Sequence, residues 1–567
     1  MDSSGMAAVF TAAAVVLLFA FMVVKGNRDR SSEIRKKILS SWGSRLPRLS
    51  FAERISHIRC FSDSLDQKCP EGRFAPVDEI TARDTDLDEV FGLFTGVLSS
   101  PGEEVLYAWL RHPLTDAAEI RHRTELEDFF AADEERRVRL GAIFAGCGHI
   151  RNRSFYEAIS SLDEAKPIGR GKYAALAAAS VLTILTLFVN PVIFVVLLIP
   201  VLFLNFRTHL QMKREIGDRL AGLAALLRLV KASEAAADTK DPETAAERAV
   251  LKKCADCFSS LRRGSFWVLS GGSVGSGLGD AVLEYVKMLF HPDLICYDQM
   301  LKAYREHADE VRTMLETFGS LDAAMACASF KASDEALSRP VFTEGGRASY
   351  AVKGLWHPLL ANPVPNDIRA ERGVLLTGSN ASGKSTFLKS AAIAAILAQS
   401  VGIVPAQSYE APCFAVFTSM ALSDNLSGGE SYFVVEIRSL KRIWDAARRE
   451  SPPVLAMVDE VLRGTNTIER IAASAQILKE LDRDNVLLFA ATHDIELSYL
   501  LEEHYENMHF EETVRGGDVQ FDYLLRRGRA SSGNALQLIR QAGFDGKTVD
   551  DAEQLARRFE ETGEWRI

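Results

Sequence analysis

The chain is 567 residues long, 47% hydrophobic and 25% charged, with a formal net charge of −10. This length predicts roughly two to four domains, and the composition is that of an ordinary globular protein. An acidic chain offers no global basic field to nucleic acid, which argues against a strong non-specific DNA binder. The eight cysteines are scattered, so we expect reduced cytosolic thiols rather than a disulfide framework.

The first predicted element is an apolar segment at residues 6–24. It is long enough to cross a hydrocarbon layer of about 30 Å. Basic residues follow this segment, starting with Lys25, and none precedes it, whereas a cleaved leader carries its positive charge first. The positive-inside rule therefore predicts a transmembrane anchor at residues 1–25, with the N-terminus outside and the rest of the soluble chain in the cytoplasm.

Residues 26–172 are predicted to form a cytoplasmic helical core region, and a second apolar block follows at 173–206. This block is too long for one crossing, and Asn190-Pro191 at its centre is typical of a tight turn. Basic residues flank it on both sides, which predicts a transmembrane hairpin with both ends cytoplasmic. A buried helical pair inside a soluble domain is the alternative. We therefore expect a multi-pass protein of an inner or plasma membrane, anchored in the lipid bilayer.

A second helical region, with core and lever helices, is predicted at residues 207–339. It contains Cys254-Ala-Asp-Cys257, a lone C-x-x-C pair in a charged, helix-like stretch. Without a second pair or neighbouring histidines in the sequence, such a pair is more often structural than metal-binding or redox-active. The glycine-rich run at 270–277 is expected to be a loop, because no strand precedes it.

Residues 340–545 alternate strand-like and helical patterns, which predicts an α/β nucleotide domain, and residues 546–567 are expected to form a helical tail. Residues 378–385 fit G-x-x-x-x-G-K-[ST] and follow a strand-like run, as a phosphate-binding loop requires. In such a loop, backbone amides and a helix N-terminus surround the phosphates. The predicted nucleotide-contacting residues here are Gly378, Ser379, Asn380, Ala381, Ser382, Gly383, Lys384, Ser385 and Thr386.

Two later strand-like runs end in residues that are suited to Mg²⁺ binding and phosphoryl transfer. One ends in Asp459-Glu460, where Asp459, together with Ser385, is predicted to hold Mg²⁺ and Glu460 to polarise the attacking water. The other ends at His493, which is predicted to contact the γ-phosphate. The predicted catalytic residues are Glu460, His493 and Lys384, and the predicted cofactors are ATP and Mg²⁺. Adenine and guanine are not distinguished, since no convincing base-stacking aromatic residue is recognised.

A Ser/Gly cluster opens the amphipathic helix predicted after residue 431. Because one subunit already supplies a lysine and metal ligands, a second helix N-terminus facing the phosphates would come from a partner subunit. This predicts ATP-dependent homodimerisation through the ATPase domains, with Ser431 as the contact across the interface and Ser427 as its competitor. An ordinary capped helix is the other interpretation.

Taken together and in order, these motifs resemble the ATPase domain of the MutS family, a branch of the ABC-type ATPases. The similar segments are Gly354–Pro358, Thr377–Thr386, Val401–Ala406, Ser431–Glu436, Asp459–Thr467 and Ala491–Leu497. The resemblance is strong over 340–545 and weaker over 85–165 and 280–335. It implies an α/β P-loop ATPase domain of ABC/MutS type following a mostly α-helical core and lever region, with composite ATP sites across a dimer.

Some positions depart from the family pattern. Ser379, Ala381 and Ser382 stand where repair proteins usually carry proline, methionine and glycine, and Leu462 replaces a customary glycine. No Phe-x-Glu mismatch reader is recognised in the N-terminal region. We therefore expect a membrane-anchored MutS-like ATPase that lacks a mismatch-recognition domain and drives a conformational switch, with DNA or an unknown protein as its partner.

Two alternatives to this function stay open. The first is DNA mismatch repair or recombination proper, which predicts a basic groove for DNA. The second is an ABC-type transporter component, which is disfavoured because the apolar blocks contain no charged residues to line a substrate path.

Overall fold

The computed structural model describes residues 32–44, 52–66, 72–150, 152–269, 278–345, 347–379, 382–420, 432–449, 452–463, 465–515, 518–530 and 543–562, together with 536, 539 and 540. The predicted anchor at residues 1–25, the glycine run at 270–277, and Asn380, Ala381, Ser427 and Ser431 lie outside the described residues. Predictions about them, and the predicted domain boundaries, stay predictions.

The chain divides into two compact units, each made of three stretches of sequence. The helical unit comprises Met1–Leu65, Phe94–Ala108 and Glu125–Ser333. The C-terminal unit comprises Asp66–Leu93, Trp109–Thr124 and Asp334–Ile567.

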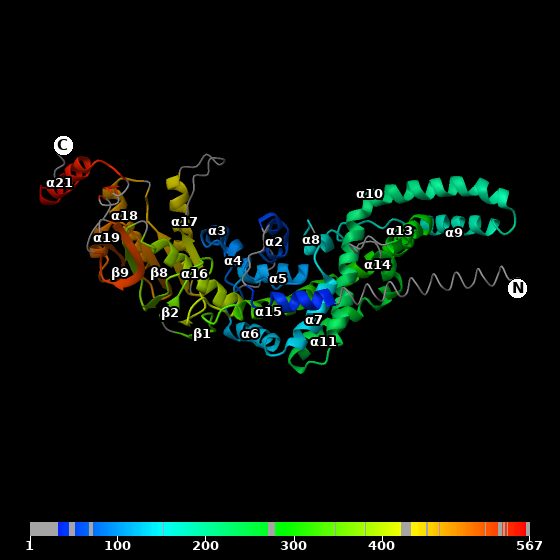
Figure 1. The fold of residues 1–567 in the computed structure, drawn as a ribbon, viewed down its shortest axis with the longest axis horizontal. Coiled ribbons are helices and arrows are strands. Elements are labelled where there is room, and N and C mark those ends of the chain that lie inside the picture. The colour runs from blue at the N-terminus through cyan, green and yellow to red at the C-terminus, as the bar shows by residue number, and fades with distance from the viewer. Residues whose placement is uncertain are drawn as a thin grey trace. The chain divides into compact units, whose positions relative to one another are not determined.

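The described part of the helical unit contains helices and no strands, as the sequence predicts (Figure 1). Its helices, of which α5 and α6 run on into the C-terminal unit, are α2 (Ala52–Asp66), α5 (Ser100–Arg111), α6 (Ala117–Ala132), α7 (Glu134–Cys147), α8 (Phe155–Ser160), α9 (Arg170–Thr186), α10 (Pro191–Ala237), α11 (Ala245–Asp256), α12 (Arg262–Leu269), α13 (Leu278–Phe290), α14 (Pro292–Glu306) and α15 (Ala308–Lys331).

Helix α5 starts at Ser100, directly after Leu98 and Ser99. Asp322 of α15 accepts hydrogen bonds there from the backbone N–H of Leu98 (3.1 Å) and Ser99 (2.8 Å) and from the Ser99 hydroxyl (2.5 Å). Asp322 is fully buried. Free N–H groups at a helix start need acceptors, so this carboxylate connects two helices that are distant in sequence.

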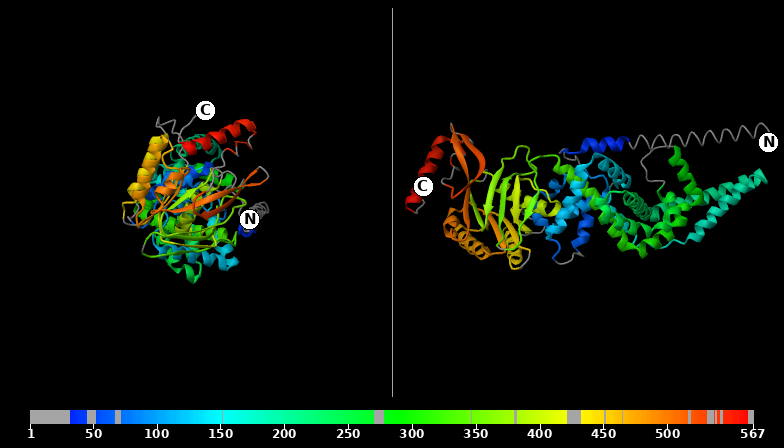
Figure 2. Two further views of the ribbon diagram at one scale, coloured as in Figure 1. Left: turned by 90° about the vertical axis from the view of Figure 1, so that its left-hand side faces the viewer. Right: turned by 90° about the horizontal axis from the view of Figure 1, so that it is seen from below.

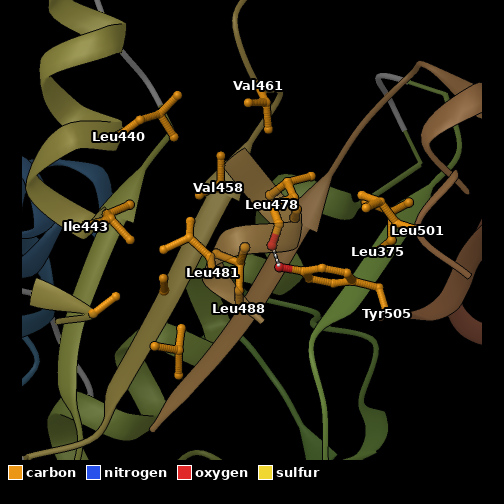
Figure 3. Packing of buried hydrophobic residues seen from close by; sticks show 14 of the residues in the cluster. Leu375, Leu440, Ile443, Val458, Val461, Leu478, Leu481, Leu488, Leu501 and Tyr505 are labelled. Carbon is orange, nitrogen blue, oxygen red and sulfur yellow. Dashed lines mark hydrogen bonds between the residues drawn. The ribbon is translucent and has the colours of Figure 1, made fainter. Parts of the chain in front are cut away.

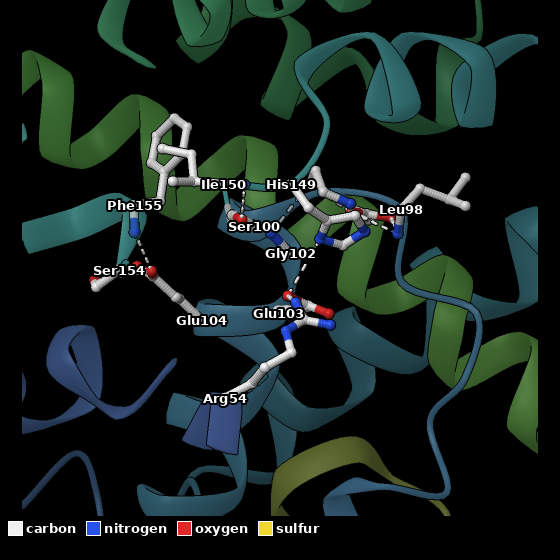
Figure 4. A network of polar contacts seen from close by, with 12 residues as sticks. Arg54, Leu98, Ser100, Gly102, Glu103, Glu104, His149, Ile150, Ser154 and Phe155 are labelled. Carbon is white, nitrogen blue, oxygen red and sulfur yellow. Dashed lines mark hydrogen bonds and ion pairs between the residues drawn. The ribbon is translucent and has the colours of Figure 1, made fainter. Parts of the chain in front are cut away.

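Two adjacent glutamates of α5, Glu103 and Glu104, contact other segments of the helical unit (Figure 4). Glu103 contacts Arg54 and lies 3.2 Å from Nδ1 of His149. Glu104 accepts hydrogen bonds from the backbone N–H groups of Phe155 and Tyr156, at the start of α8. Both carboxylates are almost completely buried.

Helices α9 and α10 form a helical hairpin at the predicted block, and the turn at Asn190-Pro191 is confirmed; its crossing of a membrane stays a prediction. Asn190 caps α10 by accepting hydrogen bonds from the N–H groups of Val192 and Ile193, and Pro191 is the first helical residue. Helix α10 does not end where the apolar run ends at residue 206 but continues to Ala237.

Among the described residues, α10 is the one helix that is long and apolar enough to cross a membrane; α9 has 17 residues. The most apolar window of α10 has a mean hydropathy of 2.1 and is 11% buried. Large apolar side chains at the hairpin tip are open to solvent, including Phe188 (83% exposed) and Val189 (85%).

The C-terminal unit is of α/β type, as predicted, and contains two sheets (Figure 2). The larger sheet has the order β10-β9-β4-β8-β7-β6, in which β10 alone is antiparallel to its neighbour. Its strands are β4 (Val374–Thr377), β6 (Ala415–Ser419), β7 (Val454–Asp459), β8 (Val486–Ala491), β9 (Glu506–Arg515) and β10 (Asp518–Arg527). The smaller sheet has the order β1-β5-β2-β3, with β1 (Pro340–Phe342), β2 (Tyr350–Leu355), β3 (Asn366–Ala370) and β5 (Ser408–Ala411).

The helices of this unit are α3 (Glu79–Asp84), α4 (Leu87–Phe91), α16 (Lys384–Val401), α17 (Tyr432–Ala446), α18 (Thr467–Leu481), α19 (Ile495–Leu500) and α21 (Gly546–Thr562). Helix α3 joins the unit through Asp84, which accepts hydrogen bonds from the Thr418 hydroxyl (2.8 Å) and the Met420 N–H (2.9 Å). Both partners lie at or just after the end of β6, so an upstream segment supports the edge of the sheet.

A buried apolar cluster fixes the centre of the larger sheet (Figure 3). Val458 of β7 and Leu488 of β8 pack there with Leu478 and Leu481 of α18. Tyr505 closes the cluster, and its hydroxyl donates a hydrogen bond of 2.7 Å to the Leu478 carbonyl. Because close-packed interiors leave little room for movement, the ends of β7 and β8 are held in place.

Candidate functional site

The candidate site lies where three neighbouring parallel strands end. In the order β4-β8-β7, residue Leu376 pairs with Ala491, and Asp459 also pairs with Ala491. The Thr492 N–H bonds to the Leu376 carbonyl and the Glu460 N–H to the Ala491 carbonyl, each at 2.9 Å. Ligands of open α/β sheets bind beyond the carboxyl ends of the strands, which is where these residues lie.

The phosphate-binding loop connects β4 to α16, as predicted. Gly378 (φ 141°) and Gly383 (φ 105°) adopt conformations that side chains disfavour, so both positions need glycine. Lys384 is 3% exposed, and its ammonium donates to the carbonyls of Gly378 (2.7 Å) and Ser379 (2.6 Å). The lysine is thus held against its own loop, beside the N-terminus of α16.

The loop also contains a buried hydroxyl, Ser379 Oγ, that has no hydrogen-bond partner in the described structure. A buried polar atom without a partner costs free energy. Together with the lysine and the N–H groups of a helix start, it forms a donor set suited to phosphate oxygens. The residues present therefore fit a nucleotide phosphate group.

Ser385 and Asp459 are brought into direct contact, the serine hydroxyl donating to a carboxylate oxygen. They come from α16 and the end of β7, which are 74 positions apart. A hydroxyl and a carboxylate are oxygen ligands of the kind that Mg²⁺ prefers. The two predicted metal ligands therefore lie together, and their chemistry fits this ion.

Glu460 and His493, predicted as catalytic, also meet. Nε2 of His493 lies 2.9 Å from a Glu460 oxygen, and Arg463 contacts the same carboxylate. Burial disfavours the charged form of Glu460, but the hydrogen bond from His493 and the charge of Arg463 outweigh it, so the pKa of Glu460 is lowered. The lowered pKa means that the carboxylate is ionised at neutral pH.

The backbone after Glu460 is strained. Glu460 (φ 59°) and Leu462 (φ 61°) both adopt the left-handed conformation that favours glycine. The related family usually carries glycine at the position of Leu462, and this geometry explains why. Here the side chain of Leu462 is buried in the apolar cluster, which offsets the strain.

Two further contacts hold the catalytic segments, and sequence reasoning missed their roles. Buried Glu436 of α17 accepts a hydrogen bond of 3.1 Å from the Arg463 N–H. Arg470 of α18 forms a two-pronged pair with Asp494, at 2.8 and 2.6 Å. Asp494 follows His493 directly, so this pair fixes the segment that carries the histidine. The sequence contains one signal for the Arg470–Asp494 pair, namely the position of Asp494 directly after the strand.

An aromatic ring that the sequence did not identify borders the loop. Tyr523 of β10 adopts φ 57° at an irregularity in the β9–β10 pairing and is 44% exposed. A Cβ atom placed on Gly383 would lie 3.2 Å from its ring. No spacing rule links residue 523 to the loop, so the sequence gives no signal for this neighbour.

The fold and site define a P-loop nucleotide-binding domain built on a mainly parallel sheet. Residues 374–560 match the family model described as MutS domain V. The predicted resemblance to the MutS family is thus confirmed, and it covers the C-terminal part of the chain.

Several relatives named DNA mismatch repair protein MutS are similar to this part. The protein from Thermus thermophilus is 32% identical over 256 residues, that is 44% of this chain and 31% of the relative. The protein from Lactobacillus delbrueckii subsp. bulgaricus is 30% identical over 280 residues, 47% of this chain and 32% of the relative. The protein from Natronomonas pharaonis is 34% identical over 226 residues, 38% of this chain and 25% of the relative. The chain thus spans about a third or less of the relatives it matches.

Proposed function

We propose that this protein is a membrane-anchored, MutS-type ATPase that uses ATP hydrolysis to drive a conformational switch. The observation that carries the proposal is the meeting of Lys384, the Ser385–Asp459 pair and the His493–Glu460 pair at the ends of three adjacent strands. Each pair joins distant segments, and each supplies a different part of phosphoryl-transfer chemistry.

In this proposal, Lys384 and the loop amides bind the phosphates, and Ser385 with Asp459 holds Mg²⁺. Bound Mg²⁺ neutralises phosphate charge and orients the transferring group. Glu460, kept ionised by its neighbours, orients the attacking water, and His493 contacts the γ-phosphate side of the site. Asp494 and Arg470 position the histidine. Tyr523 offers an aromatic face beside the loop for the nucleotide base.

The test is steady-state ATP hydrolysis by the full-length protein in detergent. Lys384→Ala should lower the rate at least about 100-fold, since electrostatic stabilisation of the transferring phosphoryl group is lost. Lys389→Ala, on the same helix but paired with Asp86, is the matched control and should keep wild-type activity. Equal rates in wild type and Lys384→Ala, or hydrolysis that persists in excess EDTA, would contradict the proposal.

Dimerisation is proposed from the amphipathic helix α17, whose Val434 (40% exposed) and Ile437 (44%) are open to solvent. Ser431, immediately before this helix, is the proposed contact to the partner's nucleotide. In a hydrolysis-deficient Glu460→Gln variant, ATP should shift the mass measured by light scattering from monomer to dimer, and ADP should not. An ATP-independent mass would argue against composite sites.

The membrane anchor is proposed from the exposed apolar side chains at the tip of α9 and α10. In vesicles whose lipids carry brominated acyl chains, a tryptophan introduced by Phe188→Trp should be quenched. The control is Phe544→Trp, at an exposed position (59%) of the C-terminal unit, which should stay unquenched. If neither tryptophan is quenched, the hairpin is not a membrane anchor.

The second candidate function is DNA mismatch repair, because the relatives carry that name. Fluorescence anisotropy with matched and mismatched duplexes, with and without ATP at physiological salt, separates the two. Tight, mismatch-preferring and ATP-sensitive binding would establish repair. Weak, salt-sensitive binding alone would favour a partner other than DNA.

A further inference from the structure

The C-x-x-C pair singled out in the sequence has partners in the fold. In the helical unit, Cys257 ends α11 as its C-cap, and His307 is the residue before α15. Cys257 Sγ, a ring nitrogen of His307 and a carboxylate oxygen of Glu310 all lie within 4.8 Å of one another. This is the one such group of potential metal ligands among the residues that the structure describes. The histidine missing from the local sequence is supplied by another helix.

The spacing of these atoms suits a tetrahedral ion. Nδ1 of His307 lies 3.7 Å from an oxygen of Glu310. A zinc ion with bonds of about 2.0–2.3 Å keeps its ligand atoms roughly 3.3–3.8 Å apart. Since all three residues are only partly buried, small side-chain rotations would bring the three ligand atoms to these separations.

Cys254, the other thiol of the pair, is the candidate for a fourth ligand. It lies one helical turn before Cys257, and residues three apart share a helix face. Its side chain is buried at this end of α11.

We propose that Cys254, Cys257, His307 and Glu310 form a zinc site that ties the end of α11 to the start of α15. Thiolate and imidazole ligands select zinc over Mg²⁺ or Ca²⁺, which prefer oxygen. The site lies in the helical unit and shares no residue with the nucleotide site. Binding of the ion stabilises the junction of these two helices, since metal affinity for the folded state adds to its stability.

These residues have a simpler explanation that makes a different prediction. His307 and Glu310 form an ion pair with i,i+3 spacing, and the Cys257 thiol donates to the Lys253 carbonyl at 3.5 Å. If those contacts are their only role, no thiolate–metal bond forms. A spectroscopic signature of metal–thiolate bonding therefore decides between the two.

The experiment uses reduced full-length protein in detergent, stripped of metal with a chelator and titrated with Co²⁺. The proposal predicts a thiolate-to-cobalt charge-transfer band that saturates at one equivalent per chain and disappears when Zn²⁺ is added. Cys257→Ser and His307→Gln should each weaken zinc affinity at least about 100-fold in competition with a chromophoric chelator, because loss of a direct ligand exceeds the effect of losing its outer-shell partner.

Cys60→Ser is the matched control, because the Cys60 thiol also donates to the carbonyl four residues earlier, at 3.6 Å. It should keep the band. Absence of the band in wild type, or a band of unchanged intensity and unchanged Co²⁺ affinity in Cys257→Ser, would overturn the proposal. Circular dichroism and ATP hydrolysis show whether each variant is folded, and the wild-type titration decides the question even if one of them is not.

Discussion

In the C-terminal unit, carboxylates such as Glu460 and Asp494 face cations, whereas in the helical unit Glu104 and Asp322 face backbone amides at helix starts. Glu460 differs from Glu104 and Asp322 in the direction of its pKa shift. The pKa of Glu460 is lowered, while burial raises that of Glu104 to about 8 and that of Asp322 to about 6, despite their hydrogen bonds. The first arrangement keeps Glu460 charged, as its proposed role requires, and the second joins helices.

The largest effect is expected where the charge does chemistry. Glu460→Gln keeps the shape of the side chain but removes the negative charge that His493 and Arg463 stabilise. We expect the steady-state hydrolysis rate to fall at least about 100-fold, as for loss of a group that activates water, with ATP affinity retained. Unchanged turnover would show that this carboxylate is structural, like those of the helical unit.

The helical unit should instead respond to pH. The pKa of Glu104 is about 8 in the folded state against an ordinary 4.5, so between these values the folded state holds a proton that the unfolded state has released. The stability from this group is complete below pH 4.5 and is lost as pH rises through 8. We expect the unfolding free energy of this unit to fall by a few kcal/mol over that window.

Glu104→Gln tests this expectation by urea unfolding at several pH values. The neutral variant should lose most of the pH dependence, whereas Glu164→Gln, at an exposed position, should behave like wild type. A Glu104→Gln variant with the full wild-type pH dependence would mean that the buried carboxyl does not cause it.

A smaller effect is expected at Arg470, which acts on His493 only through Asp494. Arg470→Ala should lower kcat for ATP about 10-fold and leave KM nearly unchanged, because a positioning contact is lost rather than a phosphate contact. Arg470→Lys should restore part of the rate. A rise in KM with normal kcat would instead indicate that Arg470 contacts the nucleotide.

The smallest effect concerns the cap of α18. Asn466 accepts a hydrogen bond of 3.0 Å from the Glu469 N–H. Asn466→Ala should destabilise the C-terminal unit by about 1 kcal/mol, and Asn466→Ser should recover most of it. Thermal unfolding of the two variants provides the comparison. Equal transition temperatures for Asn466→Ala and Asn466→Ser would exclude a capping role.

The sequence predicted the nucleotide loop and the acidic strand end because their residues are contiguous and their spacing follows from the chemistry. Neighbouring parallel strands then bring Lys384, Asp459 and His493 to one edge without further information. The hairpin turn was predicted for the same reason, since Asn190 and Pro191 determine it locally.

Contacts between distant segments could not be predicted in this way. Arg470 and Asp494, Tyr523 and Gly383, and Cys257 and His307 meet only after helices and strands have packed. The continuation of α10 beyond residue 206 was also missed, because hydropathy marks where an apolar run ends and not where a helix ends. The second sheet was not predicted either, because its short strands carry no motif.

The most direct test of the central claim is equilibrium binding of labelled ATP, with Mg²⁺, to full-length wild type and to Lys384→Ala. The account predicts saturable binding of one ATP per chain to wild type and at least about 10-fold weaker binding to the variant, since a charge-assisted contact to the phosphates is lost. No saturable binding to wild type, or equal affinity in both proteins, would contradict it.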